Sequence, residues 1–223
     1  MKICLWGDSI AKGVVFDENR GRYCLAAGRC ERVLSDHGLV TENHARMGAT
    51  VEAGYADFLA TPTEPGIVVA IEYGGNDCDM NWQEVATSPR AEHEARTPVA
   101  TFSEVLRLFV KSVLERGATP VLVLPPPLLS ARYFAWVCRN ANADGIFDYL
   151  GDVERIGRWH ARYVQAIREV ADSCGCALLD LYTPFLDARD FPGLMCRDGI
   201  HPNDRGQELM ARIALERARA LAA

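Results

Sequence analysis

A serine stands directly after the first apolar run of the chain. Residues 5–13 read LWGDSIAKG, so Ser9 follows Gly7 and Asp8 where a first strand would end. A serine in this place can cap a helix. It can also act as a nucleophile, provided that other segments supply a base for its proton and donors for a developing oxyanion.

The most distinctive candidate base is His201, in the segment RDGIHPN at residues 197–203. Asp198 lies three residues upstream, so one turn can bring its carboxylate to one ring nitrogen and leave the other free to accept a proton. Pro202 restricts the backbone of His201. The other histidines lie in polar or helical segments without a distinctive neighbour, and we interpret them as surface or hydrogen-bonded side chains. They are His37, His44, His93 and His160.

Two further segments offer donors for an oxyanion. The sequence EYGGND at residues 72–77 follows an apolar run, and the amide of Asn76 can donate to a negative oxygen. Gly48 follows another apolar run and can present an unobstructed backbone N–H. Each segment alone also reads as an ordinary turn. We interpret Asp8 and Asp77 as acids that orient these loops.

The four segments together are more specific than any one of them. Their order along the chain resembles that of the SGNH hydrolases, also called the GDSL esterase/lipase family, and the resemblance covers nearly the whole chain. It implies that Ser9 is the nucleophile, His201 the general base and acid, and Asp198 its orienting partner. It also implies an oxyanion hole formed by the backbone N–H groups of Ser9 and Gly48 and the side chain of Asn76. Gly75 departs from the family, which often has threonine there.

Short apolar runs alternate with amphipathic segments along the chain. Candidate strands lie near residues 3–6, 40–44, 67–71, 120–124 and 177–181, and helical stripes begin near Phe102, Trp159 and Leu209. This alternation predicts βαβ units in a three-layer α/β/α sandwich with about five parallel strands. The resemblance implies a flavodoxin-like sheet in the order 2-1-3-4-5. We expect residues 1–223 to form a single SGNH hydrolase domain.

Two connections, at about residues 78–100 and 125–157, are longer than ordinary loops. Both leave the carboxyl ends of strands, where open α/β sheets place their sites, so we expect short extra helices or a lid there. Their aromatic side chains either line an acyl or sugar pocket or anchor the connections to the core. The candidates for substrate binding are Trp82, Tyr133, Phe134 and Trp136.

Composition excludes several classes of function. The net charge is −6 and no basic block occurs, which disfavours a nucleic-acid partner. No apolar run reaches the ~18 residues of a membrane span, and the first residues do not resemble a secretory signal, so we expect a cytoplasmic protein. The eight cysteines form no CxxC pair, which predicts reduced thiols and no metal site.

These observations lead to one expected function with two alternatives. We expect a serine esterase that hydrolyses a small-molecule acyl ester, such as an acetylated carbohydrate, through an acyl-enzyme on Ser9. This chemistry requires neither a metal nor an organic cofactor. The alternatives are an acyltransferase on the same scaffold and a catalytically silent α/β module that binds a small molecule or a protein. The sequence leaves the oligomeric state open.

Overall fold

The computed structural model describes residues 1–222, and its main sheet has five parallel strands. In spatial order these are β4 (Val40–Asn43), β1 (Lys2–Gly7), β5 (Val68–Glu72), β6 (Thr119–Leu124) and β7 (Ala177–Asp180). Numbered by chain order within this sheet, the strands run 2-1-3-4-5, which confirms the predicted topology. Strand β1 lies between β4 and β5, and its Cys4 lies opposite Glu42 on one side and Val69 on the other.

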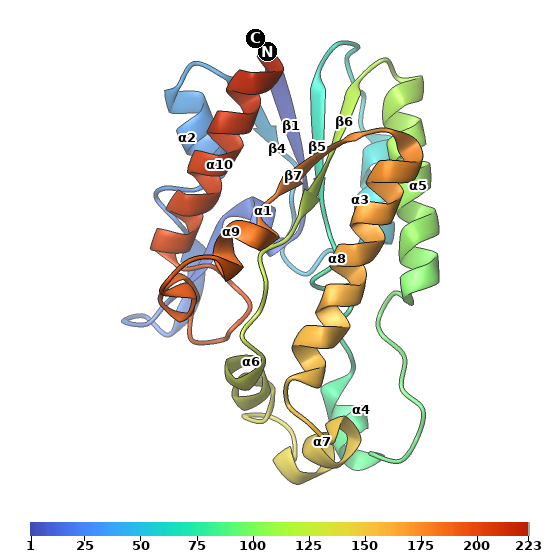
Figure 1. Ribbon diagram of the computed structural model, residues 1–223, viewed down its shortest axis with the longest axis vertical. Coiled ribbons are helices and arrows are strands. Elements are labelled where there is room, and N and C mark those ends of the chain that lie inside the picture. The colour runs from blue at the N-terminus through green and yellow to red at the C-terminus, as the bar shows by residue number, and fades with distance from the viewer. Residues whose placement is uncertain (223) are drawn as a thin grey trace.

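Helices cover both faces of this sheet, as predicted (Figure 1). On one face lie α2 (Cys30–Asp36) and α10 (Asp204–Ala222), which pack against each other. On the other face lie α3 (Val51–Ala60), α5 (Val99–Glu115) and α8 (Arg155–Cys174), with α5 in contact with both of the others. The result is the expected three-layer sandwich.

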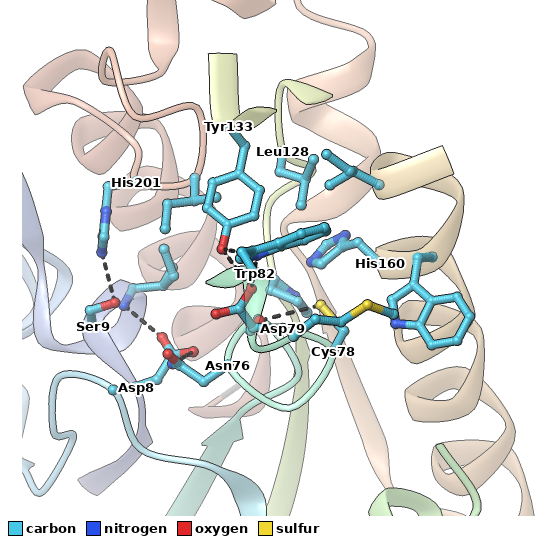
Figure 2. Close-up of a pocket in the computed structure, with 18 of the residues that line it drawn as sticks. Asp8, Ser9, Asn76, Cys78, Asp79, Trp82, Leu128, Tyr133, His160 and His201 are labelled. Carbon is cyan, nitrogen blue, oxygen red and sulfur yellow. Dashed lines mark hydrogen bonds between the residues drawn. The ribbon is translucent and has the colours of Figure 1, made fainter. Parts of the chain in front are cut away.

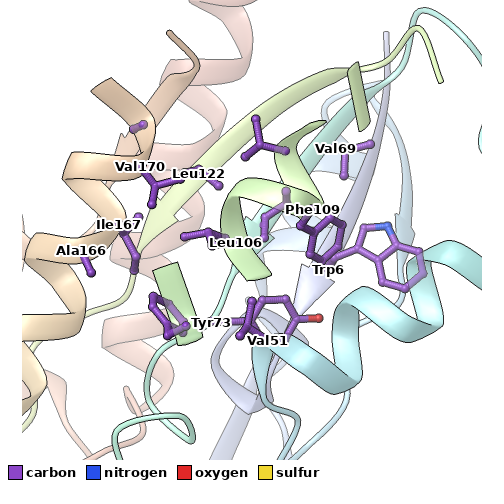
Figure 3. Close-up of a cluster of buried hydrophobic side chains, with 14 of the residues drawn as sticks. Trp6, Val51, Val69, Tyr73, Leu106, Phe109, Leu122, Ala166, Ile167 and Val170 are labelled. Atoms are coloured by element: carbon purple, nitrogen blue, oxygen red, sulfur yellow. The ribbon is translucent and has the colours of Figure 1, made fainter. Parts of the chain in front are cut away.

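Both faces of the strands are buried, which explains their unbroken apolar sequences. On one face Ile3 packs in a cluster with Leu34 and Leu215 from α2 and α10. On the other face Trp6 packs edge-on against Phe58 and Phe109 from α3 and α5, in the larger cluster of Figure 3. Complete burial of a phenylalanine side chain contributes about 1.5–3 kcal/mol.

A small β-hairpin follows the first strand and was not predicted from the sequence. It pairs β2 (Val14–Asp17) with β3 (Arg22–Leu25) in antiparallel register, and Phe16 lies opposite Tyr23. Between β1 and this hairpin, the chain makes the single helical turn α1 (Ser9–Lys12). The hairpin therefore begins one turn after Ser9.

The two long connections contain short helices, as expected. The first holds α4 (Trp82–Thr87), and the second holds α6 (Ser130–Val137) and α7 (Ala143–Leu150). These three helices gather beyond the carboxyl ends of the strands, at the bottom of Figure 1, and α4 packs against α7. The chain then completes the sheet and continues through α9 (Tyr182–Leu186) and a 3-10 turn at Phe191–Leu194 to α10.

A helix that crosses a bilayer needs about 20 mostly apolar residues. Within residues 1–222, no helix is both long and apolar enough to cross a membrane.

Candidate active site

Ser9 occupies a tight turn at the carboxyl end of β1. The strand ends at Gly7, and Asp8 caps the following turn by accepting a hydrogen bond from the Ile10 N–H at 2.8 Å. A Cβ atom at Gly7 would lie 2.6 Å from the Ala11 Cβ and 2.7 Å from the Glu72 carbonyl oxygen. Only glycine fits this close approach, so Gly7 lets the chain turn and present Ser9.

Ser9, His201 and Asp198 form a triad-like arrangement although 192 positions separate the serine from the histidine. The Ser9 Oγ lies 2.8 Å from His201 Nε2, and His201 Nδ1 lies 2.7 Å from Asp198 Oδ2. Figure 2 shows the first of these contacts at the edge of the pocket. The imidazole can therefore take the hydroxyl proton on one nitrogen while the carboxylate holds the other.

Asp198 is completely buried and is held by four donors. Its Oδ1 accepts the backbone N–H groups of Ile200 and His201, and its Oδ2 accepts from the imidazole and from the Tyr23 hydroxyl at 3.0 Å. Burial acts to raise the pKa of Asp198, but the hydrogen bonds and charge of His201 and the two N–H groups hold it below its usual range. Asp198 therefore remains an anion that can orient the imidazole.

Tyr23 is a site residue that the sequence reasoning missed. It comes from the unpredicted hairpin, and its ring centroid lies 5.0 Å from that of His201. Burial, and then the charge of Asp198, raises the pKa of Tyr23, so its hydroxyl stays protonated and acts as a donor. The signal in the sequence is weak and consists of two short apolar runs, at residues 14–16 and 23–25, on either side of a polar turn that contains Gly21.

The expected oxyanion donors lie around the same cavity as Ser9. Gly48 has a φ of 78°, a conformation that L side chains rarely adopt, and both it and Asn76 line the cavity. Within residues 1–222, the backbone N–H groups of Ser9 and Gly48 donate to no acceptor. The three expected donors thus belong to residues that line one cavity.

Two buried acids hold these donors in place. Asp8 accepts a hydrogen bond from the Asn76 amide at 2.9 Å, which ties that amide to the Ser9 turn. Asp77 accepts from the backbone N–H groups of Val51 and Gly74, which ties the start of α3 to the loop after β5. Burial raises the pKa of Asp77 to about 6. These contacts agree with the interpretation of both acids as residues that orient loops.

Glu72 lies behind the nucleophile turn and was also missed. It is buried, and its Oε2 accepts from the Ala11 N–H at 3.2 Å and from the Asp8 N–H at 3.5 Å. Burial, and then the charge of Asp8, raises the pKa of Glu72 well above its usual range. As the last residue of an apolar strand it carries no distinctive sequence signal.

A cavity of about 230 Å³ opens beside Ser9 and has a mainly apolar lining. Trp82 and Tyr133, two of the predicted substrate-binding residues, line it. The other two do not. Phe134 packs in a neighbouring hydrophobic cluster, and Trp136 packs edge-on against Phe16 and borders a separate surface hollow.

His160 also lines this cavity, contrary to its interpretation as a surface or hydrogen-bonded histidine. It is buried on the inner face of α8, stacks on Tyr182, and has no hydrogen-bond partner among the described residues. Burial lowers the pKa of His160 to about 4, so the ring is neutral at pH 7. The remaining histidines are hydrogen-bonded or stacked: His37 and His93 contact carbonyl oxygens, and His44 stacks on Trp6.

Among residues 1–222, one group of side chains has the residue types and spacing to bind a metal ion. Ligand atoms of Cys4, Glu42 and His44 lie within 4.8 Å of one another. The Lys2 ammonium lies 2.9 Å from Glu42 Oε1 and supplies that carboxylate with a cation already. The group borders a second, smaller cavity that shares no residue with the one beside Ser9. We therefore assign no metal-dependent role in the site to it.

Comparison with known proteins agrees with this geometry. Residues 5–209 match the GDSL-like Lipase/Acylhydrolase family, and the chain belongs to this family, whose members are the SGNH hydrolases. Among solved structures, a lipase/acylhydrolase from Enterococcus faecalis is similar with a TM-score of 0.65 and 21% identity, over 99% of this chain and 96% of that one. The esterase EstA from Pseudoalteromonas, inhibited by monoethylphosphonate, has a TM-score of 0.61 and 17% identity, over 99% and 98%.

Curated relatives are similar over part of their length. The human protein named isoamyl acetate-hydrolyzing esterase 1 homolog is 24% identical over 144 residues, which is 65% of this chain and 52% of that protein. Its bovine counterpart is 26% identical over 145 residues. The chain therefore aligns with about half of the length of these relatives.

Proposed function

We propose that this chain is a serine ester hydrolase that acts on small acyl esters through an acyl-enzyme on Ser9. The observation that carries the proposal is the 2.8 Å contact between Ser9 Oγ and His201 Nε2, with Asp198 bonded to the opposite ring nitrogen. A serine hydroxyl is a weak nucleophile until a base accepts its proton, and this contact supplies that base.

The reaction has two steps on the same groups. The Ser9 oxygen attacks the ester carbonyl while His201 takes its proton, and the oxyanion is stabilised by the N–H groups of Ser9 and Gly48 and the amide of Asn76. His201 then protonates the departing alcohol, which leaves an acyl group on Ser9. Water attacks this acyl-enzyme and gives a proton to His201, which returns it to the Ser9 oxygen as the bond to the acyl group breaks and the carboxylic acid leaves.

The size and lining of the cavity support a small substrate. Its volume of about 230 Å³ is below the ~300–1,000 Å³ of pockets for drug-sized ligands. The names of the similar proteins point the same way, because one refers to isoamyl acetate and another structure to inhibition by a monoethylphosphonate. Trp82 and Tyr133 would contact the bound ester from the far side of the cavity.

A panel of p-nitrophenyl esters of increasing acyl length tests this proposal. Wild-type protein is expected to prefer the shortest acyl groups and to show a burst of p-nitrophenol if release of the acyl group is the slow step. Ser9→Ala is expected to lose about 10⁴-fold or more in kcat while its circular dichroism spectrum is unchanged. Full turnover by Ser9→Ala would contradict the assignment of the nucleophile.

A further inference from the structure

The cavity beside Ser9 contains a carboxylate that the proposed mechanism does not use. Asp79 lies three residues after Asn76 and lines the cavity. Its Oδ1 accepts a hydrogen bond from the Tyr133 hydroxyl at 2.6 Å and another from the Trp82 indole N–H at 2.8 Å. In the view of Figure 2, this carboxylate lies between Ser9 and His160.

These two contacts leave the other oxygen of Asp79 available. Tyr133 and Trp82 have one polar hydrogen each. The Tyr133 hydrogen is directed at Oδ1, and the Trp82 hydrogen is shared between Oδ1 and, at 3.2 Å, the Tyr133 oxygen. Burial, and then the charge of Asp79, raises the pKa of Tyr133 well above its usual range, so the hydroxyl remains a donor. Within residues 1–222, no group donates to Asp79 Oδ2. A carboxylate oxygen in an apolar cavity favours a ligand that brings a hydrogen-bond donor to it.

The other polar groups of the cavity restrict the charge of that ligand. Arg155 also lines the cavity, and its guanidinium is held by the Tyr149 carbonyl oxygen at 2.7 Å. A cationic ligand that Asp79 attracts would be repelled by Arg155, and an anionic ligand that Arg155 attracts would be repelled by Asp79. His160 is neutral because burial lowers its pKa to about 4. A neutral donor, such as a hydroxyl group, fits this set.

We propose that Asp79 determines substrate specificity by accepting a hydrogen bond from a neutral hydroxyl group of the ester. This inference rests on the proposed function, since it names the class of ester that the same site takes. The substrate is then a small, uncharged ester that carries a free hydroxyl group, and a purely alkyl ester of the same shape is a poorer substrate. Tyr133 and Trp82 act through Asp79, because their hydrogen bonds fix the orientation of its carboxylate.

Pairs of esters that exchange a hydroxyl for a methyl group test this directly. One pair varies the alcohol, 4-hydroxybutyl acetate against pentyl acetate, and the other varies the acid, methyl 6-hydroxyhexanoate against methyl heptanoate. Wild-type protein is expected to have a kcat/KM about tenfold or more higher for the hydroxyl member of at least one pair, because a hydrogen bond to a charged acceptor is stronger than one between neutral groups.

The variant Asp79→Asn isolates the carboxylate. Asparagine can keep an oxygen for Tyr133 and Trp82, but it replaces the second oxygen with an amide that donates instead of accepting. The preference for the hydroxyl ester is expected to fall to within about threefold of unity. The control Asp148→Asn, at an exposed position on α7, is expected to keep the wild-type preference. Labelling of Ser9 by a fluorophosphonate probe shows that each variant is folded with a reactive site.

The outcomes separate this inference from the function on which it rests. Equal kcat/KM values for both members of both pairs in the wild type would overturn it, as would an undiminished preference in Asp79→Asn. An equal loss for hydroxyl and methyl esters would also overturn it, because a loop defect lowers both. If the wild type neither hydrolyses any ester nor labels at Ser9, the proposed function itself fails.

Discussion

The hydroxyl of Tyr23 donates a hydrogen bond to the carboxylate of Asp198 at 3.0 Å. The oxygen that accepts it, Oδ2, is the same one that lies 2.7 Å from His201 Nδ1. The hairpin that carries Tyr23 therefore restrains one carboxylate oxygen of the triad acid, while the backbone N–H groups of Ile200 and His201 restrain the other.

Replacement of Tyr23 by phenylalanine removes this donor and keeps the aromatic ring beside His201. We expect kcat/KM for p-nitrophenyl acetate to fall about tenfold, because a hydrogen bond to a charged group contributes about 1.5–3 kcal/mol and the carboxylate loses one restraint. Steady-state kinetics measure this. Tyr55→Phe, which breaks a 3.0 Å contact with Ser112 on α3 and α5, is the matched control. Equal rates for Tyr23→Phe and Tyr55→Phe would show that Tyr23 has no role in orienting the triad.

Gly48 offers a test of the oxyanion hole with an internal control. Gly48 and Gly38 have φ values of 78° and 81°, and a Cβ atom at either would meet no heavy atom within 4 Å. Alanine at each position should therefore cost a similar stability, about 1–2 kcal/mol, measured by urea denaturation. Only Gly48→Ala is expected to lower kcat, by about tenfold or more, because its N–H is displaced from the oxyanion. An equal kcat for the two variants would argue against Gly48 as a donor.

The buried Glu72 should make the free energy of unfolding fall as pH rises above the usual pKa of a glutamate, 4.5. Because burial raises the folded-state pKa, the folded protein holds this proton more tightly than the unfolded chain. Its contribution is complete below pH ~4.5 and is lost as pH rises toward the raised pKa. Glu72→Gln mimics the protonated form, so we expect it to match the wild type near pH 4.5 and to exceed it increasingly at higher pH.

Thermal denaturation of wild type and Glu72→Gln between pH 4.5 and 9 measures this difference. Glu104→Gln, at an exposed position on α5, is the control and should show a constant offset from the wild type. A constant offset for Glu72→Gln as well would mean that Glu72 titrates normally in the folded protein.

The buried His160 should make the free energy of unfolding fall as pH decreases, because its folded-state pKa is lowered. Burial lowers its folded-state pKa from 6.5 to about 4, so the unfolded chain binds the proton first. The stability from the neutral ring is present above pH ~6.5 and is lost as pH falls toward about 4, on the order of 3 kcal/mol in total. His160→Gln should remove this dependence, whereas His37→Gln, at an exposed position, should retain it. Parallel pH profiles for wild type and His160→Gln would contradict the assignment.

The sheet and its helices could be predicted because their signals are long and local. Unbroken apolar runs at residues 67–71 and 120–124 indicate strands buried on both faces, and the structure places β5 and β6 there. The hairpin that carries Tyr23 lacks such a signal, because strands of four residues with mixed burial resemble a loop. Its position depends on contacts with distant segments, such as that between Tyr23 and Asp198.

The meeting of Ser9, His201 and Asp198 was predicted from motif order, because parallel strands place their carboxyl ends at one edge. The aromatic residues of the second connection were harder to assign. Tyr133 and Phe134 are adjacent on α6, and successive helical residues point about 100° apart, so only one of them faces the cavity. The sequence alone does not tell which of these two side chains faces the cavity.

The position of His160 in the cavity wall could not be predicted from the sequence either. Its helix α8 has a clear apolar stripe, and His160 belongs to the buried face of that helix together with Tyr163 and Ile167. A polar side chain on such a face is ordinarily exposed or hydrogen-bonded. Here it lines the cavity, which only the placement of α8 beside the loop after β5 reveals.

The central claim is that Ser9 forms a covalent bond to the acyl group with His201 as its base. The most direct measurement is mass spectrometry of the protein after reaction with a fluorophosphonate, followed by peptide mapping. We expect one adduct in the wild type, on the peptide that contains Ser9. The adduct should be absent in Ser9→Ala and should form far more slowly in His201→Ala. An adduct on another residue, or undiminished labelling of Ser9→Ala, would contradict it.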